Sequence, residues 1–284
     1  MYAESTLVCG RTAKVRKIPQ TPFQGQKRRF IKDFKEVLKR FDNITTVVDL
    51  FGGSGLLSHV TKRERPDVRV IYNDYDYFCD RLANVTTTNE ILSRIRPVLQ
   101  GVEREKKVPA EQRAQILAII SEYSEKGYVD YITLGSSLLF SGKWAKTFRE
   151  LSKATMYNVV RKANFDVTGY LDGLEVVHKD YRKLFAQFKD DKDVLFLIDP
   201  PYLATDVVSY ENYWSLSDYL DVLKLLVGTK YVYFTSNKSQ VVELCEWINT
   251  NASVGNPFKG VEIRTQQNSL NYHTSFTDIM LVRE

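Results

Sequence analysis

The sequence has 284 residues, and its 43% apolar and 26% charged residues are proportions typical of a folded globular protein, which excludes a fully disordered chain. The length suits one large domain, or one domain that carries a substantial insertion. The longest apolar runs, such as the one at residues 194–198, are far shorter than the roughly 18 residues that cross a bilayer, so we expect no membrane span.

Positive charge is concentrated at the start of the chain. The net charge is +5, yet residues 1–40 alone hold eleven Lys and Arg against three Asp and Glu, which leaves the remainder slightly acidic. Such asymmetry is typical of a protein that binds a polyanion, although a basic amphipathic helix with a solvated face has the same composition. Charge alone leaves both interpretations open.

The three cysteines and three histidines share no metal-ligand spacing, so we expect neither a disulfide framework nor a bound metal. Residues 1–10 also lack the apolar stretch of a signal peptide. The sequence therefore predicts a cytoplasmic protein.

Strand-like and helix-like segments alternate from residue 45 onward. The predicted strands cover residues 46–50, 67–73, 175–178, 194–198 and 231–234. Five helices are predicted within this alternation. The first starts at residue 56, the second covers 75–95, the third ends at 188, and the last two cover 216–227 and 240–248. Strands joined through helices pair in parallel, whereas two further strand-like segments at 261–265 and 278–282 follow each other without a helix. The pattern predicts an α/β fold with an open, mostly parallel sheet and an antiparallel strand at the end.

Residues 95–174 interrupt this alternation. A helical stretch there begins after Pro109 and ends at Gly127, and a Gly- and Ser-rich stretch and mixed loops follow it. We predict one domain formed by residues 1–94 and 175–284, with residues 95–174 inserted between its sheet elements.

The first chemically informative strand end is a glycine-rich turn. Ligands of an open parallel sheet bind beyond the carboxyl ends of the strands, where glycines let a ligand approach the backbone closely. The turn follows the strand that ends at Asp49 and comprises Phe51, Gly52, Gly53, Ser54 and Gly55. It lacks the lysine of a phosphate-binding loop and the spacing of a dinucleotide-binding motif, so by itself it fits a structural turn equally well.

The second strand end carries Asp74, 25 residues after Asp49. An acid at about this distance from a glycine turn suits the hydroxyl groups of a bound ribose. The alternative is that Asp74 caps the helix that follows it.

The third strand end is Asp199-Pro200-Pro201-Tyr202, directly after a buried apolar strand. Two prolines stiffen the turn and remove two backbone donors, so the Asp199 carboxylate and the Pro200 carbonyl become fixed acceptors. Tyr202 adds a flat ring beside them. Two acceptors and a stacking surface suit an amino group on a flat heterocycle.

These motifs, read as DLFGGSG, YNDYD and DPPY in that order, resemble the Dam-type DNA adenine methyltransferases over nearly the whole chain. The resemblance implies a Rossmann-like methyltransferase fold, S-adenosylmethionine as the cofactor and double-stranded DNA as the partner. It also implies an inserted target-recognition region where the sequence places its insertion.

The resemblance extends to further cofactor contacts. Phe23, Gly25 and Lys27 are similar to the family segment that contacts the methionine part of the cofactor. Asp180 and Tyr181 are similar to a segment whose acid binds the cofactor's adenine. The run that contains Thr205, Tyr210, Tyr213 and Trp214 is similar to the loop that covers the target base.

The insertion also holds a basic stretch that predicts contact with DNA. Residues 141–165 contain six bases and one acid, interleaved with aromatic residues. If residues 143–153 are helical, the spacing of four of the bases places them on one face, where they could follow a phosphate backbone. A solvated helix face is the alternative. The candidate DNA-binding residues are Lys143, Lys146, Arg149, Lys153, Asn158, Arg161 and Lys162.

Two departures concern the recognition sequence. Relatives that read GATC carry an Arg-Tyr-Asn segment and then Phe-Asn-Val-Pro, whereas this chain has Met156-Tyr157-Asn158 and Phe165-Asp166-Val167-Thr168. The arginine and the proline are both absent, so the sequence does not predict GATC. A related palindrome and a relaxed site both stay open.

The expected reaction is methyl transfer to the amino nitrogen of a flipped-out adenine. Asp199 and the Pro200 carbonyl would hold the amino group, Tyr202 would stack on the base, and Phe51 with the glycine turn would place the cofactor. The same motif also serves amino methylation of cytosine N4 or of RNA, and a catalytically silent DNA-binding homologue is a third alternative. The sequence leaves open whether the enzyme acts with a cognate restriction endonuclease, in a phage, or as a solitary methylase.

Overall fold

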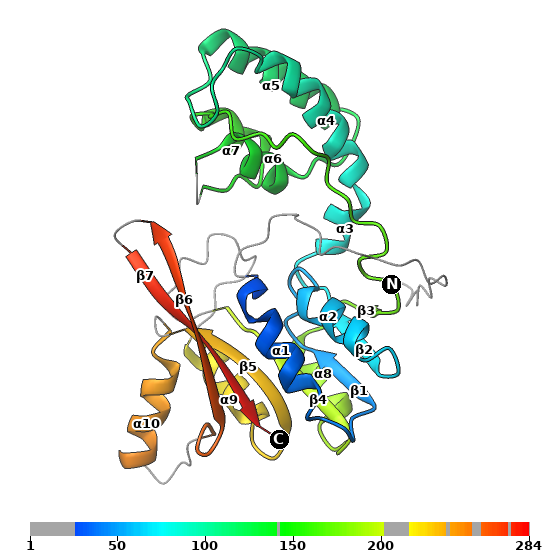
Figure 1. Ribbon diagram of the computed structural model, residues 1–284, viewed down its shortest axis with the longest axis vertical. Coiled ribbons are helices and arrows are strands. Elements are labelled where there is room, and N and C mark those ends of the chain that lie inside the picture. Colours follow the sequence, from blue (N-terminus) through cyan, green and yellow to red (C-terminus); the bar gives the residue numbers. More distant parts are fainter. Residues whose placement is uncertain are drawn as a thin grey trace. The chain divides into compact units, whose positions relative to one another are not determined.

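A computed structural model describes residues 26–140, 143–201, 216–236, 239–251, 257–271 and 274–283. These residues form two compact units (Figure 1). Residues 26–78 and 171–283 make an α/β unit, and residues 79–170 make a helical unit. The boundaries differ from the predicted 94/95 and 174/175, because the helix expected over 75–95 is two helices whose larger part packs in the helical unit.

The α/β unit is built on a seven-stranded sheet with the order β3-β2-β1-β4-β5-β7-β6. The strands are β1 (Thr46–Asp49), β2 (Arg69–Asn73), β3 (Glu175–Val177), β4 (Val194–Ile198), β5 (Lys230–Ser236), β6 (Glu262–Asn271) and β7 (Thr274–Arg283). The first five pair in parallel, and β7 runs antiparallel to β5 and β6. The predicted open, mostly parallel sheet with an antiparallel end is confirmed.

Strand order reverses between β1 and β4. From β1 the chain builds the sheet outward through β2 and β3, then returns to add β4 and β5 on the other side. The carboxyl ends of β1 and β4 therefore flank the switch point, which is where open α/β sheets bind their ligands. The glycine turn follows β1 and Asp199 follows β4, so the two predicted motifs meet there.

Helices cover both faces of the sheet because the central strands are apolar on both sides. On one face, α1 (Ile31–Leu38) and α2 (Leu56–Glu64) pack over the sheet, with the Phe34 ring 6.4 Å from that of Phe234 on β5. On the other face, α8 (Tyr181–Phe188), α9 (Leu216–Leu225) and α10 (Val241–Asn251) share a core with side chains such as Phe196 and Tyr233. Figure 1 shows these two helical layers.

The β6–β7 hairpin is longer than the predicted strands at 261–265 and 278–282. The additional residues are polar, and alternation of apolar residues could not identify them. Gln266 donates to the Asp33 carboxylate on α1 at 2.9 Å, and Arg264 forms ion pairs with Asp33 and Glu36. Polar contacts with α1 therefore hold part of this hairpin.

The helical unit contains most of α3 (Phe78–Ala83) and all of α4 (Val85–Val98), α5 (Ala110–Ser124), α6 (Tyr131–Leu138) and α7 (Phe148–Lys153). Its core is separate from that of the sheet. It includes Ile91 and Leu92 from α4, Ile116 from α5, Leu134 from α6 and Leu151 from α7. The single helix expected over 75–95 is wrong: Asn84 interrupts it with a non-helical φ of −97° and ψ of 14°.

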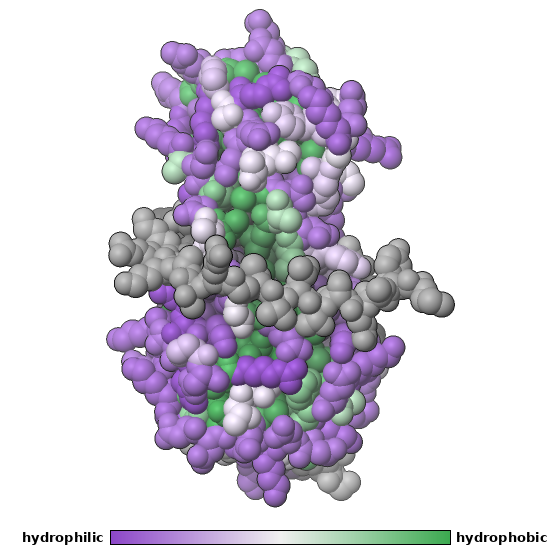
Figure 2. Space-filling model, turned by 90° about the vertical axis from the view of Figure 1, so that its right-hand side faces the viewer, coloured by the Kyte–Doolittle hydropathy of each residue, from purple (hydrophilic) through white to green (hydrophobic). Residues whose placement is uncertain are grey.

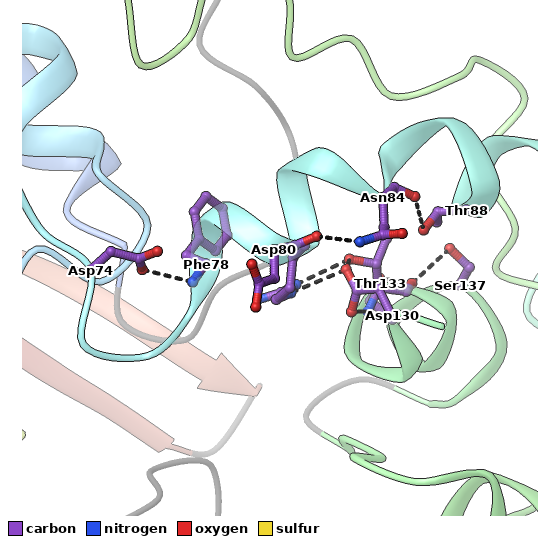
Figure 3. A network of polar contacts seen from close by, with 10 residues as sticks. Asp74, Phe78, Asp80, Asn84, Thr88, Asp130, Thr133 and Ser137 are labelled. Carbon is purple, nitrogen blue, oxygen red and sulfur yellow. Dashed lines mark hydrogen bonds and ion pairs between the residues drawn. The ribbon is translucent and has the colours of Figure 1, made fainter. Parts of the chain in front are cut away.

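A buried ion pair lies inside the helical unit. Arg81 on α3 donates through Nε to the Asp130 carboxylate at 3.1 Å and through Nη2 to the Thr133 hydroxyl at 3.0 Å. Asp130 also accepts from the Thr133 backbone N–H and caps α6 (Figure 3). Because the charges are paired and hydrogen-bonded, this network fixes α3 against α6 without leaving a buried charge uncompensated.

Most of the surface seen in Figure 2 is hydrophilic on both units. Among the described residues, no helix combines the length and the apolar character needed to cross a membrane.

Candidate active site

The glycine turn packs closely against β2. A Cβ on Gly52 would lie 2.3 Å from the Tyr72 ring and 2.9 Å from the Asn73 carbonyl oxygen, so a side chain has no room there. Gly53 and Gly55 have φ values of 49° and 69°, in the left-handed region that glycine adopts without strain. The Tyr72 hydroxyl donates to the Gly53 carbonyl at 2.7 Å. Tyr72 on β2 therefore holds the glycine turn in place.

Asp49 is buried at the end of β1, with 1% of its surface exposed. One carboxylate oxygen accepts from the Ser58 hydroxyl on α2 at 2.7 Å. The other, Oδ1, has no hydrogen-bond partner in the described part of the chain. Burial raises the pKa of Asp49 to about 7, helped by the nearby charge of Asp199 and opposed by the Ser58 hydrogen bond. A buried acceptor without a partner is suited to a ligand that brings a donor or a positive charge.

Asp74 fulfils the capping alternative. Its Oδ1 accepts from the backbone N–H of Phe78, the first residue of α3, at 2.7 Å (Figure 3). The same oxygen accepts from the Tyr72 hydroxyl at 3.1 Å. Asp74 thus links the glycine turn, β2 and α3, and its role toward a ribose stays a prediction.

Asn73 was not identified from the sequence, yet it joins three strand ends. Its amide nitrogen donates to the carbonyls of Leu50 and Lys179 at 3.0 and 2.9 Å, and its amide oxygen accepts from the Lys179 N–H at 2.9 Å. A buried asparagine at a strand end next to Asp74 was the available signal, because such an amide must find partners in the backbone around it.

Asp180 and Tyr181 lie at the start of α8. The Asp180 carboxylate accepts from the Arg182 N–H at 2.8 Å and so caps this helix. Tyr181 is buried, and its ring centroid lies 5.0 Å from that of Phe51 in the glycine turn. The structure therefore brings the predicted segment around residue 180 to the glycine turn.

An exposed aromatic cluster was also missed by the sequence analysis. His178 stacks on Tyr75 and Tyr77, with ring centroids 5.2 and 4.4 Å away, and its Nδ1 is 2.8 Å from the Asp74 carbonyl oxygen. Tyr77 has a φ of 53°, which is unusual for a residue other than glycine. The tyrosines are separated from the histidine by about a hundred positions, so no local pattern could have joined them.

Asp199 directly follows β4 at the switch point and is itself followed by two buried prolines. Its Oδ2 accepts from Lys27 Nζ at 2.7 Å, while one fifth of the Asp199 side-chain surface stays exposed. Burial raises the pKa of the Asp199 carboxyl, the charge of Lys27 lowers it, and the charge of Asp278 raises it. The carboxylate is fixed by an ion pair and remains partly accessible.

Lys27 is one of the predicted cofactor contacts, and in the structure its ammonium group contacts the Asp199 carboxylate. The resemblance assigned it to the methionine part of the cofactor, which stays untested. Phe23, Gly25 and Tyr202 lie outside the described residues, as do Thr205, Tyr210, Tyr213 and Trp214.

The basic stretch of the insertion differs from the predicted helical face. Helix α7 begins at Phe148, so Lys143 and Lys146 precede it and the face expected over 143–153 is wrong. Thr147 and Glu150 cap the helix start, since the Thr147 hydroxyl accepts from the Glu150 N–H and the Glu150 carboxylate accepts from the Lys146 N–H. These caps place the helix boundary beyond the first two lysines.

The remaining candidates for DNA contact have different settings. Lys143, Lys146, Arg149, Lys153 and Lys162 are all exposed. Asn158 donates to the Val102 carbonyl at 2.6 Å, so its amide already has an internal partner. The Arg161 guanidinium lies 4.3 Å from the centroid of the Phe165 ring.

The model of the D12 class N6 adenine-specific DNA methyltransferases matches residues 23–242, which include all of these strand-end motifs. A Haemophilus influenzae protein named "Putative methyltransferase" is 37% identical over 235 residues, covering 80% of this chain and 78% of its own.

Two solved structures align at low identity. A precorrin-6y C5,15-methyltransferase from Geobacter metallireducens is 11% identical, with a TM-score of 0.34 over 92% of this chain and 94% of its own. A SAM dependent methyltransferase from Agrobacterium tumefaciens is 12% identical, with a TM-score of 0.38 over 89% of this chain and 60% of its own. The family match spans most of the chain, and the protein belongs to the D12 class N6 adenine-specific DNA methyltransferase family.

Proposed function

We propose that this protein is a site-specific DNA methyltransferase that transfers a methyl group from S-adenosylmethionine to N6 of an adenine flipped out of the duplex. The observation that carries the proposal is the meeting of two motifs at the switch point. The rigid Asp199-Pro200 turn after β4 lies beside the glycine turn after β1. The family supports adenine in DNA as the target.

The residues at this edge fit S-adenosylmethionine. The turn at Gly52 leaves no room for a side chain, which keeps the backbone open to a ligand, and the buried Oδ1 of Asp49 lacks a partner in the described structure. Phe51 and Tyr181 contribute aromatic surface next to the turn. When bound, the cofactor supplies a methyl group on a positively charged sulfur.

The chain's own residues must make the amino nitrogen reactive. The lone pair of the adenine amino group is delocalised into the ring, so the nitrogen is a weak nucleophile until acceptors hold its N–H groups. Asp199 and the Pro200 carbonyl are placed on one stiff turn for this purpose, and such fixed acceptors stabilise charge that develops on the nitrogen. The methylated nitrogen carries a positive charge until it loses a proton. The Asp199 carboxylate is a suitable acceptor for that proton.

Residues 79–170 are proposed to read the target sequence. A base inside a duplex cannot reach a buried carboxylate, so the adenine must leave the stack at a cost of a few kcal/mol. Exposed basic side chains such as Lys143 and Arg149 offer phosphate contacts that offset this cost.

The test is methyl transfer from radiolabelled S-adenosylmethionine to duplex DNA and to RNA, followed by chromatography of the digested nucleosides. The proposal expects N6-methyladenine from DNA only. N4-methylcytosine or labelled RNA would assign the same amino-group chemistry to another substrate. Absence of transfer to either, with the cofactor still bound, would identify a silent DNA-binding homologue.

A further inference from the structure

Lys27 differs from the other bases near the start of the described chain. Lys35 and Arg40 form ion pairs with Glu64 and Glu262, and all four side chains in these pairs are at least 28% exposed. The Lys27 side chain is 4% exposed, and its partner Asp199 lies 172 positions away in the sequence. Burying an ammonium group is costly unless a partner compensates its charge, and Asp199 supplies that compensation for Lys27.

The ion pair divides the two oxygens of Asp199. Oδ2 accepts from Lys27 Nζ at 2.7 Å, and Oδ1 makes no hydrogen bond to another described residue. The rigid prolines that follow prevent the turn from relaxing. Lys27 therefore fixes the Asp199 carboxylate through Oδ2, and Oδ1 is not engaged by this ion pair.

The charges around Asp199 would otherwise favour its protonation. Burial and the charge of Asp278 on β7 raise the pKa of Asp199, and the charge of Asp199 in turn raises the pKa of Asp49 at the end of β1. Tyr233 on β5 is buried and neutral, since burial and the neighbouring groups raise the pKa of its hydroxyl. Lys27 supplies the opposing charge from the segment before the 3-10 turn Arg28–Phe30.

We propose that Lys27 is a positioning residue for the reaction: its buried ammonium keeps Asp199 anionic and holds one carboxylate oxygen, so that the other faces the target amino group. This inference rests on the proposed function. It departs from the cofactor contact that the resemblance implies for Lys27.

A neutral residue at position 27 would impair the reaction through Asp199. Asp199 must accept a hydrogen bond from the amino group and then receive the proton that the methylated nitrogen loses. A protonated Asp199 cannot do both. The bond balance is simple: the amino lone pair forms the bond to the methyl carbon, the sulfur keeps the electrons of the bond that breaks, and the proton leaves the nitrogen. An anionic Asp199 can receive that proton, and a protonated one cannot.

The direct test is the titration of Asp199 itself. Protein labelled with ¹³C at the aspartate carboxyl groups is followed by NMR, and the Asp199 signal is assigned from its loss in Asp199→Asn. Lys27→Met should raise the titration midpoint of Asp199 by at least about one pH unit, the lower end of the effect of an adjacent opposite charge. Lys27→Gln serves as a second neutral variant, because it keeps an N–H donor if the methionine variant does not fold. Lys35→Met is the matched control and should leave the midpoint unchanged.

Methyl transfer and cofactor binding complete the test. Lys27→Met should lower methyl transfer at least roughly tenfold at pH 7, with recovery as the pH rises and Asp199 ionises, while Lys27→Arg keeps the wild-type profile. The affinity for S-adenosylmethionine should change by less than about threefold. An unshifted Asp199 titration midpoint in both neutral variants would overturn the inference. If cofactor binding were also weakened in these variants, Lys27 would be assigned to cofactor binding instead. The NMR midpoint is measured without substrate, so it stands or falls separately from the proposed function.

Discussion

The two units of the molecule handle charge in different ways. At the carboxyl edge of the sheet, Asp49 and Lys27 are buried, Asp199 is buried in part, and burial raises the pKa of both acids. In the helical unit, the buried Arg81–Asp130 pair is structural, and the bases proposed to contact DNA are largely on the surface. Buried charges respond to pH and surface charges respond to salt. Chemistry and recognition should therefore be separable by these two variables.

The largest effect should follow from a change of Asp199, the carboxylate that we propose to be catalytic. Asp199→Asn keeps the size of the side chain but removes the anion, and we expect methyl transfer to fall at least roughly 100-fold, as for loss of one preorganised hydrogen-bonding group. Single-turnover assays measure this, and calorimetry should show that S-adenosylmethionine still binds. Activity within about threefold of wild type would show that the acceptor lies elsewhere.

Asp49 should make the stability of the α/β unit depend on pH. Its pKa is raised from 3.8 to about 7 in the folded protein, so between these values the folded state retains a proton that the unfolded state has lost. The free energy of unfolding therefore falls as the pH rises from about 4 to 7, and levels off above it. Because the charge of Asp199 also acts on Asp49, we expect an effect of about 2 kcal/mol rather than the full shift.

Urea unfolding of wild type and Asp49→Asn at pH 5 and pH 7.5 measures this effect. In Asp49→Asn the free energy of unfolding should no longer fall between these pH values. The variant should therefore be more stable relative to wild type at pH 7.5 than it is at pH 5. Parallel pH profiles for the two proteins would contradict the assignment. Asp130→Asn is the comparison in the helical unit, where loss of the charge should destabilise the protein at both pH values because it removes the carboxylate that compensates the buried charge of Arg81.

Two glycines provide a matched comparison of packing. Gly52→Ala places a methyl group 2.3 Å from the Tyr72 ring, so we expect a loss of about 1–2 kcal/mol in stability and weaker cofactor binding. Gly135→Ala lies inside α6 with its nearest neighbour at 3.4 Å, and should stabilise by up to about 1 kcal/mol. Thermal unfolding of both variants measures the difference. A Gly52→Ala protein with unchanged melting and binding would show that the turn can move.

The sequence predicted most of the α/β unit because local pattern and topology agree there. The apolar strand at 194–198, the glycine turn and the hairpin at the end are recognisable from short segments, and strand order then brings Asp49 and Asp199 together. The Lys27–Asp199 pair and the stacking of His178 on two tyrosines could not be predicted, since they join residues more than a hundred positions apart.

The helical unit was harder to predict, and the reasons are local. The start of α7 depends on the cap formed by Thr147 and Glu150, which competes with the spacing of the lysines before it. Similarly, the break at Asn84 occurs within residues 75–95, whose pattern predicted one continuous helix. Charge spacing identified the basic segment but not its conformation.

The smallest effect, and the one that addresses the surface charges, is the salt dependence of DNA binding. Lys143 and Lys146 are exposed and precede α7, so they can contact phosphates without sharing a helical face. Each phosphate contact that is lost should lower the slope of log affinity against log salt by about 0.9, so Lys143→Ala with Lys146→Ala should flatten it by nearly two. Fluorescence anisotropy with a labelled duplex at several salt concentrations measures the slope.

Lys32→Ala with Lys39→Ala is the matched control, because these exposed lysines lie on or directly after α1 in the basic segment of the α/β unit. Several bases of that segment already have internal partners, such as Glu64 for Lys35 and Glu262 for Arg40, which reduces the charge available to a polyanion. We therefore expect the control pair to leave the slope nearly unchanged. The opposite result, a flattened slope only in the control pair, would move the DNA surface to the α/β unit, and salt would then no longer separate recognition from chemistry.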